Sequence, residues 1–296
     1  MKNWIVAFRL RTLPLALASI GMGAFLAGAS GNFDALVFGL CALTTIFLQV
    51  LSNLANDYGD SIHGADSTER QGPSRAVQSG AITKAQMKRA ILIFVLLSLA
   101  SGIALIYVAF GWMSFNFNLF LGIGALAILA AITYTAGYKP YGYAGLGDIS
   151  VLIFFGFVAV MGSAFLYEQS LNWNYLLPAI SVGFFSVAVL NVNNIRDIES
   201  DEKAGKRSIP VRLGRDAAVR YHWFLLFSGF AAALVYVALN YVAVTQFLFV
   251  LSLPLLLVNA RAVHSKRNAA ELDPFLKQMA LSTLLFVVLF GLGSLL

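Results

Sequence analysis

Two segments of the chain concentrate carboxylate and amide side chains. The first acidic motif (residues 53–66) reads Asn53-Leu-Ala-Asn56-Asp57-Tyr-Gly-Asp60-Ser-Ile-His-Gly-Ala-Asp66, and the second (residues 193–202) reads Asn193-Asn194-Ile-Arg196-Asp197-Ile-Glu-Ser-Asp201-Glu. On a helix, side chains three, four and seven positions apart share a face, so each motif would present a row of oxygen atoms. Because carboxylates four residues apart repel each other, such rows are stabilised by a bound cation. Oxygen ligands select a hard ion, and the motifs therefore predict a Mg²⁺ site.

Basic residues accompany both acidic motifs. Arg70 and Arg75 follow the first motif, Arg196 lies within the second, and Lys206 and Arg207 follow it. Guanidinium and ammonium groups bind phosphate oxygens well. Acidic and basic side chains in the same loop are what a metal–diphosphate site requires. The alternative is a pair of ordinary charged loops at a membrane boundary, in which Asp and Asn cap helices.

A third segment, residues 134–148, combines one cation with aromatic rings. Lys139 is its only basic residue, and it stands among four tyrosines, Tyr134, Tyr138, Tyr141 and Tyr143. Lys139 is a candidate to hold a diphosphate oxygen, and tyrosine faces are candidates to stabilise a developing carbocation. The alternative is an aromatic belt at the membrane interface with a lysine that extends to water.

The composition identifies the environment in which these motifs lie. Of the 296 residues, 59% are hydrophobic and only 11% are charged, and the mean hydropathy is +0.79. Soluble domains are about 45–50% apolar and about 25% charged. These values exclude a soluble enzyme, a disordered chain and a nucleic-acid binder, and Cys41 alone permits no intrachain disulfide. The chain is predicted to be an integral membrane protein.

Apolar windows long enough to cross a bilayer predict the fold. A spanning helix needs about 20 predominantly apolar residues. Nine such windows occur, at about residues 13–31, 34–55, 90–112, 117–137, 147–167, 175–194, 221–240, 242–260 and 276–296. We therefore expect an all-α polytopic membrane protein, with residues 1–296 forming a single domain of nine helices around a central cavity. The first window could instead be a signal peptide, and the seventh and eighth are separated only by weak turn signals at residues 240–245.

The charged residues predict the orientation. With nine spans, all 20 basic residues fall on one side, and the opposite loops carry only Asp34 and Glu168. The positive-inside bias makes the basic side cytoplasmic, which places the N-terminus and both acidic motifs there. The motifs follow the second and sixth spans, a spacing that hints at an internal duplication directed at one cavity. The net charge of +6 then reflects topology and an anionic substrate rather than affinity for nucleic acid.

These residues resemble the UbiA superfamily of intramembrane aromatic prenyltransferases, over nearly the whole chain. The pattern is most similar to the branch that prenylates 1,4-dihydroxy-2-naphthoate in menaquinone biosynthesis. The residues that carry this similarity are Asn56-Asp57-Tyr58-Gly59-Asp60, Gly64-Ala-Asp66, residues 72–80, Gly145-Leu-Gly147-Asp148, Phe154-Phe155-Gly156, Asn193-Asn194-Ile-Arg196-Asp197 and Gly205-Lys206-Arg207. Asp66 follows Asp60 by six positions rather than the four of the commoner superfamily form, which leaves its role less defined.

The resemblance implies a fold, a reaction and roles for individual residues. Members have nine helices and use Mg²⁺ to bind an isoprenyl diphosphate at two Asp-rich cytoplasmic motifs. The implied metal ligands are Asp57, Asp60, Asp66, Asp197 and Asp201. The implied substrate-binding residues are Asn53, Asn56, Arg75, Tyr134, Asn193, Asn194, Arg196, Lys206 and Arg207, with Lys139 counted among the catalytic residues. The implied reaction joins a polyprenyl chain to the naphthoate ring with loss of carbon dioxide, in the cytoplasmic membrane and without an obligate protein partner.

Two other functions fit parts of the sequence. A prenyltransferase acting on 4-hydroxybenzoate or homogentisate shares all of this chemistry. A membrane transporter also carries acidic residues, but these usually lie near the bilayer midplane within spans. Here the acidic residues gather at one membrane face, which favours the enzyme.

Overall fold

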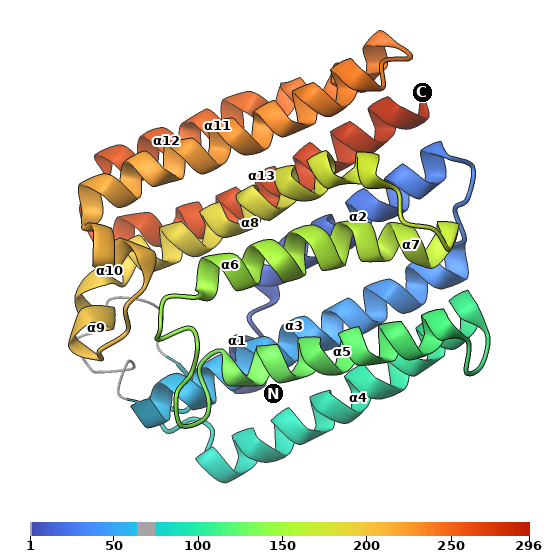
Figure 1. Cartoon of the computed structure of the whole chain (residues 1–296). Helices are drawn as coiled ribbons and strands as arrows, with labels where there is room; N and C mark the ends of the chain where they lie inside the picture. Colours follow the sequence, from blue (N-terminus) through green and yellow to red (C-terminus); the bar gives the residue numbers. More distant parts are fainter. Residues whose placement is uncertain (1, 64–74) are drawn as a thin grey trace.

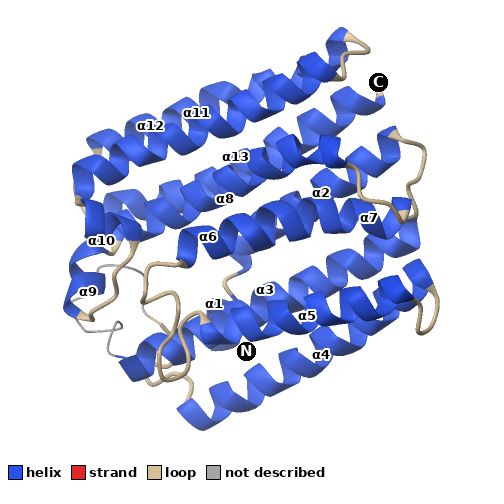
Figure 2. Cartoon of the chain, viewed as in Figure 1, coloured by secondary structure: helices blue, strands red, loops and turns tan. Residues whose placement is uncertain are grey.

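The computed structural model describes residues 2–63 and 75–296, and every regular element in these residues is a helix (Figures 1 and 2). The elements, in chain order, are α1 (Lys2–Phe8), η1 (Leu10–Thr12), α2 (Leu13–Ala29), α3 (Ala35–His63), α4 (Lys84–Phe110), α5 (Phe115–Thr133), α6 (Gly147–Val151), η2 (Leu152–Gly162), α7 (Ser163–Glu168), η3 (Trp173–Tyr175), α8 (Leu176–Arg196), α9 (Ile198–Lys203), α10 (Ile209–Leu213), α11 (Arg215–Leu239), η4 (Val244–Ser252), α12 (Leu253–Ser265) and α13 (Ala269–Leu295). The predicted all-α fold is confirmed.

Nine helical stretches among the described residues are long and apolar enough to cross a membrane, as predicted. They are Lys2–Ala29, Ala35–His63, Lys84–Phe110, Phe115–Thr133, Gly147–Glu168, Trp173–Arg196, Arg215–Leu239, Val244–Ser265 and Ala269–Leu295. The weakly marked seventh and eighth spans are separate, because α11 ends at Leu239 and η4 begins at Val244. The second span is longer than predicted, because α3 continues into the first acidic motif as far as His63.

Side-chain caps fix where several of these helices begin. Thr83 precedes α4 and forms a reciprocal capping box, in which its hydroxyl accepts from the Gln86 amide and its own amide donates to the Gln86 side chain at 2.9 Å. Ser114 caps α5 by accepting from the Phe117 amide at 3.1 Å. Asp34, just before α3, accepts a hydrogen bond from the Leu36 amide in the first turn of that helix at 2.7 Å. These polar residues stop the apolar runs and set the spans' ends.

The two sides of the bundle pack differently. Helices α8, α11 and α13 pack with α2, η2 and η4 around fully buried phenylalanines, among which the Phe185 and Phe286 rings meet edge to face at 4.9 Å. Helices α3, α4 and α5 form the other side, at the bottom of Figure 1. The cavity described below lies between α3, α4 and α5 on one side and α2 and η2 on the other. The η2 segment is a π-helix, a wide turn that often occurs at functional sites.

One end of the bundle gathers the polar segments. The short helices α9 and α10 and the turns of residues 134–146 lie together at the left of Figure 1. Gly59 lets α3 approach these turns, since a Cβ at this position would lie 2.5 Å from the Thr135 carbonyl group. The Thr135 hydroxyl in turn donates to the Asn56 side chain at 3.0 Å and to the Ala55 carbonyl at 3.1 Å. The contact fixes the first acidic motif against the segment that carries the tyrosines.

Gly59→Ala should therefore lower the stability of the protein. The added methyl group meets backbone atoms that cannot move aside, and such overpacking costs about 1–3 kcal/mol. Gly39→Ala on the same helix is the matched control, because a Cβ there meets nothing within 4 Å. Thermal unfolding in detergent measures both variants. Equal midpoints for the two variants would contradict the close approach.

Candidate active site

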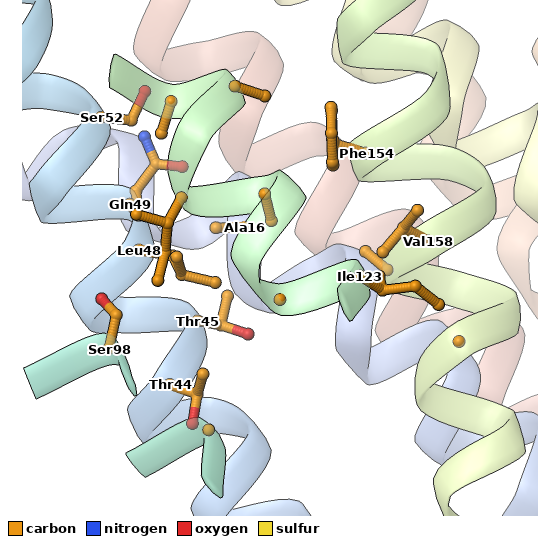
Figure 3. A pocket seen from close by; sticks show the side chains of 18 of the residues that line it. Ala16, Thr44, Thr45, Leu48, Gln49, Ser52, Ser98, Ile123, Phe154 and Val158 are labelled. Carbon is orange, nitrogen blue, oxygen red and sulfur yellow. The ribbon is translucent and has the colours of Figure 1, made fainter. Parts of the chain in front are cut away.

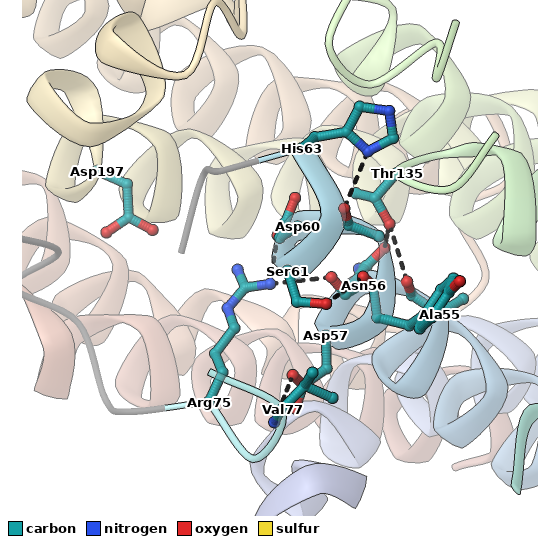
Figure 4. Close-up of polar contacts among 12 residues, drawn as sticks. Ala55, Asn56, Asp57, Asp60, Ser61, His63, Arg75, Val77, Thr135 and Asp197 are labelled. Carbon is teal, nitrogen blue, oxygen red and sulfur yellow. Dashed lines mark hydrogen bonds and ion pairs between the residues drawn. The ribbon is translucent and has the colours of Figure 1, made fainter. Parts of the chain in front are cut away.

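The ends of the two acidic motifs meet at the polar end of the bundle. Residues 53–63 of the first motif form the last turns of α3, and the second motif occupies the end of α8 and the following helix α9. The ammonium group of Lys206 interacts electrostatically with both motifs, with Asp201 most strongly and then with Asp60. Figure 4 shows Asp197 of the second motif across from Asp60 and Arg75. The structure thus brings together two segments more than 130 positions apart in the sequence.

Asp60 of the first motif pairs with a guanidinium group and a phenol. It is 3% exposed, forms a salt bridge with Arg75 and accepts a hydrogen bond from the Tyr143 hydroxyl at 2.9 Å. Arg75 also donates to the carbonyl oxygen of Asn56 at 3.0 Å. The predicted residues Asp60 and Arg75 are therefore neighbours. The sequence predicts no separate role for Tyr143, and its pairing with Asp60 is not evident from sequence spacing.

Asp57 has different partners. Its two carboxylate oxygens accept from the backbone amides of Ala76 at 3.1 Å and Val77 at 3.2 Å, and the residue is 1% exposed. These contacts hold the turn that starts just after Arg75 (Figure 4). The sequence predicts Asp57 as a metal ligand, whereas in the structure its carboxylate secures the loop that delivers Arg75 to Asp60.

In the second motif, Asp201 pairs with Lys206. The Lys206 ammonium lies 3.1 Å and 3.2 Å from the two Asp201 carboxylate oxygens, and both residues are buried. Burial alone would lower the pKa of Lys206, but the nearby carboxylates of Asp201 and Asp60 raise it above the ordinary value. Lys206 is therefore a permanent buried cation between the two motifs.

Asp197 is held by Arg196 in a bidentate pair. Arg196 Nε and Nη2 lie 2.8 Å and 2.7 Å from the two Asp197 oxygens, and Nη2 also donates to the Asn193 side chain at 2.8 Å. Arg196 Nη1 lies 2.6 Å from Asp273 at the start of α13. The predicted phosphate-binding Arg196 is thus occupied by protein groups. Asp273 was not predicted, although it belongs to the predicted cytoplasmic side.

The asparagines of the motifs mostly hold neighbouring segments. Asn53 donates to the Phe8 carbonyl and to the Thr12 hydroxyl, both at 2.9 Å, and so ties α3 to the first span. The Asn56 side chain accepts from Thr135, as described above. Asn194 is buried, and its side-chain oxygen receives no hydrogen bond from the described part of the chain. Of these amides, Asn194 retains an oxygen that a ligand can use.

Three predicted site residues lie away from this cluster or cannot be placed. Lys139 is exposed, with its ammonium 5.6 Å from the centre of the Tyr138 ring, and Arg207 is also exposed. Asp66 lies outside the described residues. The buried lysine at the centre of the site is therefore Lys206 and not Lys139.

Tyr134 lies where the charged cluster meets an apolar cavity. Its hydroxyl fits beside Gly147, where a Cβ would lie only 2.9 Å away, and burial raises its pKa above the ordinary value. Tyr134 and Asn56 both line the cavity. These two side chains thus connect the polar end of the bundle with its apolar interior.

The cavity has a volume of about 380 Å³ and is lined mainly by apolar side chains (Figure 3). Phe154, Phe155 and Val158 line it from the π-helix. Helix α3 adds a row of polar side chains that leads toward Asn56, namely Thr45, Gln49, Ser52 and Asn53. The arrangement accepts a long apolar group with a polar end directed at the acidic motifs.

The oxygen atoms of the cluster suit a hard cation that also binds a substrate. No three Asp, Glu, His or Cys side chains among residues 2–63 and 75–296 lie close enough to hold a metal ion by themselves. Within the same ranges, Asn194 Oδ1 is buried and accepts no hydrogen bond, and the buried Asp201 carboxylate has the Lys206 ammonium as its partner. Mg²⁺ is commonly bound by one or two carboxylates together with substrate phosphates and water. The residues therefore fit Mg²⁺ carried with a diphosphate.

Comparison with known proteins identifies the family and its fold. Residues 16–290 match the model of the UbiA prenyltransferase family. The chain is 48% identical to a 1,4-dihydroxy-2-naphthoate octaprenyltransferase of Haemophilus influenzae, over 100% of this chain and 96% of that one. It is 46% identical to the protein of the same name from Escherichia coli, over 98% of this chain and 94% of that one.

Solved structures share the architecture at low sequence identity. A UbiA homologue from Aeropyrum pernix, solved without ligand, aligns with a TM-score of 0.70 and 17% identity over 97% of both chains. A UbiA homologue from Archaeoglobus fulgidus bound to DMAPP and Mg²⁺ aligns with a TM-score of 0.69 and 16% identity over 99% of both chains. The chain belongs to the UbiA prenyltransferase family.

Proposed function

We propose that this protein transfers a polyprenyl chain from polyprenyl diphosphate to 1,4-dihydroxy-2-naphthoate, with loss of carbon dioxide, to give demethylmenaquinol. The observation that carries the proposal is the 46–48% identity to two enzymes of that acceptor class over at least 98% of this chain. The charged cluster above an apolar cavity supports it independently, because a polyprenyl diphosphate has the same division into a charged head and an apolar tail.

The charged head would bind at the cluster of Asp60, Asp197 and Asp201. These carboxylates and the free oxygen of Asn194 would hold Mg²⁺ together with oxygens of the diphosphate, and the ion would supply positive charge to the departing diphosphate. Lys206 and Arg75 would add positive charge to the same oxygens. The homologue from Archaeoglobus fulgidus was solved with DMAPP and Mg²⁺ in the same fold, which supports Mg²⁺ together with an isoprenyl diphosphate as the ligands.

The remaining predicted residues take supporting roles in this proposal. Asp57 keeps the Arg75 loop in place and is left out of the metal-binding set. Lys206 is the buried cation of the site, while the Lys139 and Arg207 side chains are exposed, where they would attract the diphosphate. The position of Asp66 in the ligand set rests on the sequence alone.

The cavity would hold the apolar chain and exclude water from the reacting carbon. Cleavage of the carbon–oxygen bond leaves an allylic cation, and the electron pair of that bond leaves with the diphosphate. The Tyr134 ring borders the cavity close to the charged cluster, and the face of an aromatic ring stabilises a cation. The electron-rich ring of the acceptor then attacks the cation and loses its carboxylate as carbon dioxide.

We propose that the site end of the bundle faces the cytoplasm. The predicted excess of Lys and Arg on this side supports that orientation in a cytoplasmic membrane. We treat residues 1–296 as one transmembrane domain, with the bilayer and two small molecules as the only required partners.

Asp60→Asn and Asp197→Asn should each reduce prenyl transfer by about 100-fold or more. Each change removes the charge of a proposed metal ligand, and even residues behind metal ligands contribute about 10–100-fold. Glu199→Gln, an exposed acidic residue of the second motif, is the control and should retain activity. Turnover and the elution profile in detergent are measured together. Near-normal turnover in either aspartate variant would refute its assignment.

Removal of divalent metal should stop turnover in a reversible way. EDTA would take away the ion that offsets the diphosphate charge, and added Mg²⁺ should restore the initial rate. A matched excess of EDTA already saturated with Mg²⁺ serves as the control. Undiminished activity in EDTA would overturn the metal-dependent mechanism.

A panel of acceptors separates the proposed function from its closest alternative. With one polyprenyl diphosphate, 1,4-dihydroxy-2-naphthoate should be prenylated in preference to 4-hydroxybenzoate and homogentisate. Product formation and carbon dioxide release are measured for each acceptor. Preference for either of the other two would assign the protein to a sister activity with the same charged site.

A further inference from the structure

Four charged side chains form a row of ion pairs that ends at the proposed metal site. Arg11 Nη1 lies 3.0 Å from one oxygen of Asp273, and Arg196 Nη1 lies 2.6 Å from the other. Arg196 in turn holds both oxygens of Asp197, at 2.7 Å and 2.8 Å. Positive and negative groups alternate along this row, which joins η1, the end of α8 and the start of α13.

Burial restricts the geometry of the inner pair of this row, Arg196 and Asp197. The side chains of Arg196 and Asp197 are 0% and 4% exposed, whereas those of Asp273 and Arg11 are 27% and 35% exposed. A buried guanidinium next to a buried carboxylate has a defined geometry, because leaving either group unpaired is costly. The partially exposed Asp273 reaches the opposite edge of the same guanidinium and fixes its direction.

We propose that Asp273 is a positioning residue that prepares Asp197 for Mg²⁺. Asp273 shares the Arg196 guanidinium with Asp197, so the positive charge of Arg196 is not spent on Asp197 alone. Asp197 then keeps negative charge for a cation while its two oxygens stay in a fixed orientation. The inference rests on the proposed Mg²⁺–diphosphate site, in which Asp197 is a ligand.

The charge balance predicts the direction in which each substitution changes cation binding at Asp197. The four side chains are neutral in sum. Loss of the Asp273 charge leaves two guanidinium groups against one carboxylate, which repels a cation at Asp197. Loss of the Arg11 charge leaves two carboxylates against one guanidinium, which attracts a cation.

Asp273→Asn should therefore raise the Mg²⁺ concentration needed for half-maximal effect by about 10-fold, the size expected when a group behind a metal ligand is lost. The full-length protein in detergent is titrated with Mg²⁺ at fixed inorganic pyrophosphate, and the rise in unfolding temperature is recorded. The Mg²⁺ dependence of turnover is measured in parallel. Asp216→Asn is the matched control, because Asp216 also pairs with an arginine, Arg267 at 3.3 Å, but is 76% exposed.

Arg11→Gln provides a second test if Asp273→Asn does not fold. Its Mg²⁺ requirement should stay equal to that of the wild type or fall, and Asp273→Glu should lie closer to the wild type than Asp273→Asn. A lower unfolding temperature of Asp273→Asn with an unchanged Mg²⁺ requirement would reduce Asp273 to a structural role and overturn the inference. A higher requirement in Arg11→Gln would overturn it as well. Absence of any Mg²⁺ effect in the wild type would instead refute the proposed function.

Discussion

The polar end of this protein depends on the pairing of buried carboxylates. Asp60, Asp197 and Asp201 are 3%, 5% and 4% exposed, and an unpaired charge at such depth costs several kcal/mol. Each has its own cation, respectively Arg75, Arg196 and Lys206. The loops that carry Arg75 and Lys206 are therefore fixed to the end of α3 and to α9 by the requirement for neutrality, whereas Arg196 is the last residue of α8 itself. Lys206 links the two motifs, because its ammonium group interacts with Asp60 as well as with Asp201.

This pairing changes the physical argument made from the sequence. Rows of carboxylates on a helix repel each other, and a bound cation was the expected remedy. In the structure, side-chain cations already provide that remedy, so the site is stable as a set of ion pairs. On the proposed function, Mg²⁺ held by these carboxylates would supply positive charge to the diphosphate, and Arg75 and Lys206 would add positive charge to the phosphate oxygens.

Some features were predictable because they depend on local sequence. The nine spans follow from the length of apolar runs, and the facing of Asp60 and Asp201 toward one site follows from helical periodicity and the position of the motifs. The burial of Lys206 and the exposure of Lys139 were not predictable, since they depend on the direction in which each loop folds back. The partners of Asp57 and Asp273 are likewise set by contacts between distant segments, for which spacing carries no signal.

The two motifs look equivalent in sequence, but the packing of their helices divides the work between them. Helix α3 turns polar and small side chains from Thr45 to Asn56 into the cavity, so that on the proposed function it would border both the charged head and the apolar tail of the substrate. Helix α8 is enclosed by α11 and α13, and among the described lining residues it contributes only Leu190. Its motif, all of which the structure describes, therefore contributes charged side chains to the site but does not line the cavity. The surroundings of the two motifs thus differ because α8 packs solidly around phenylalanines, whereas α3 borders the open cavity.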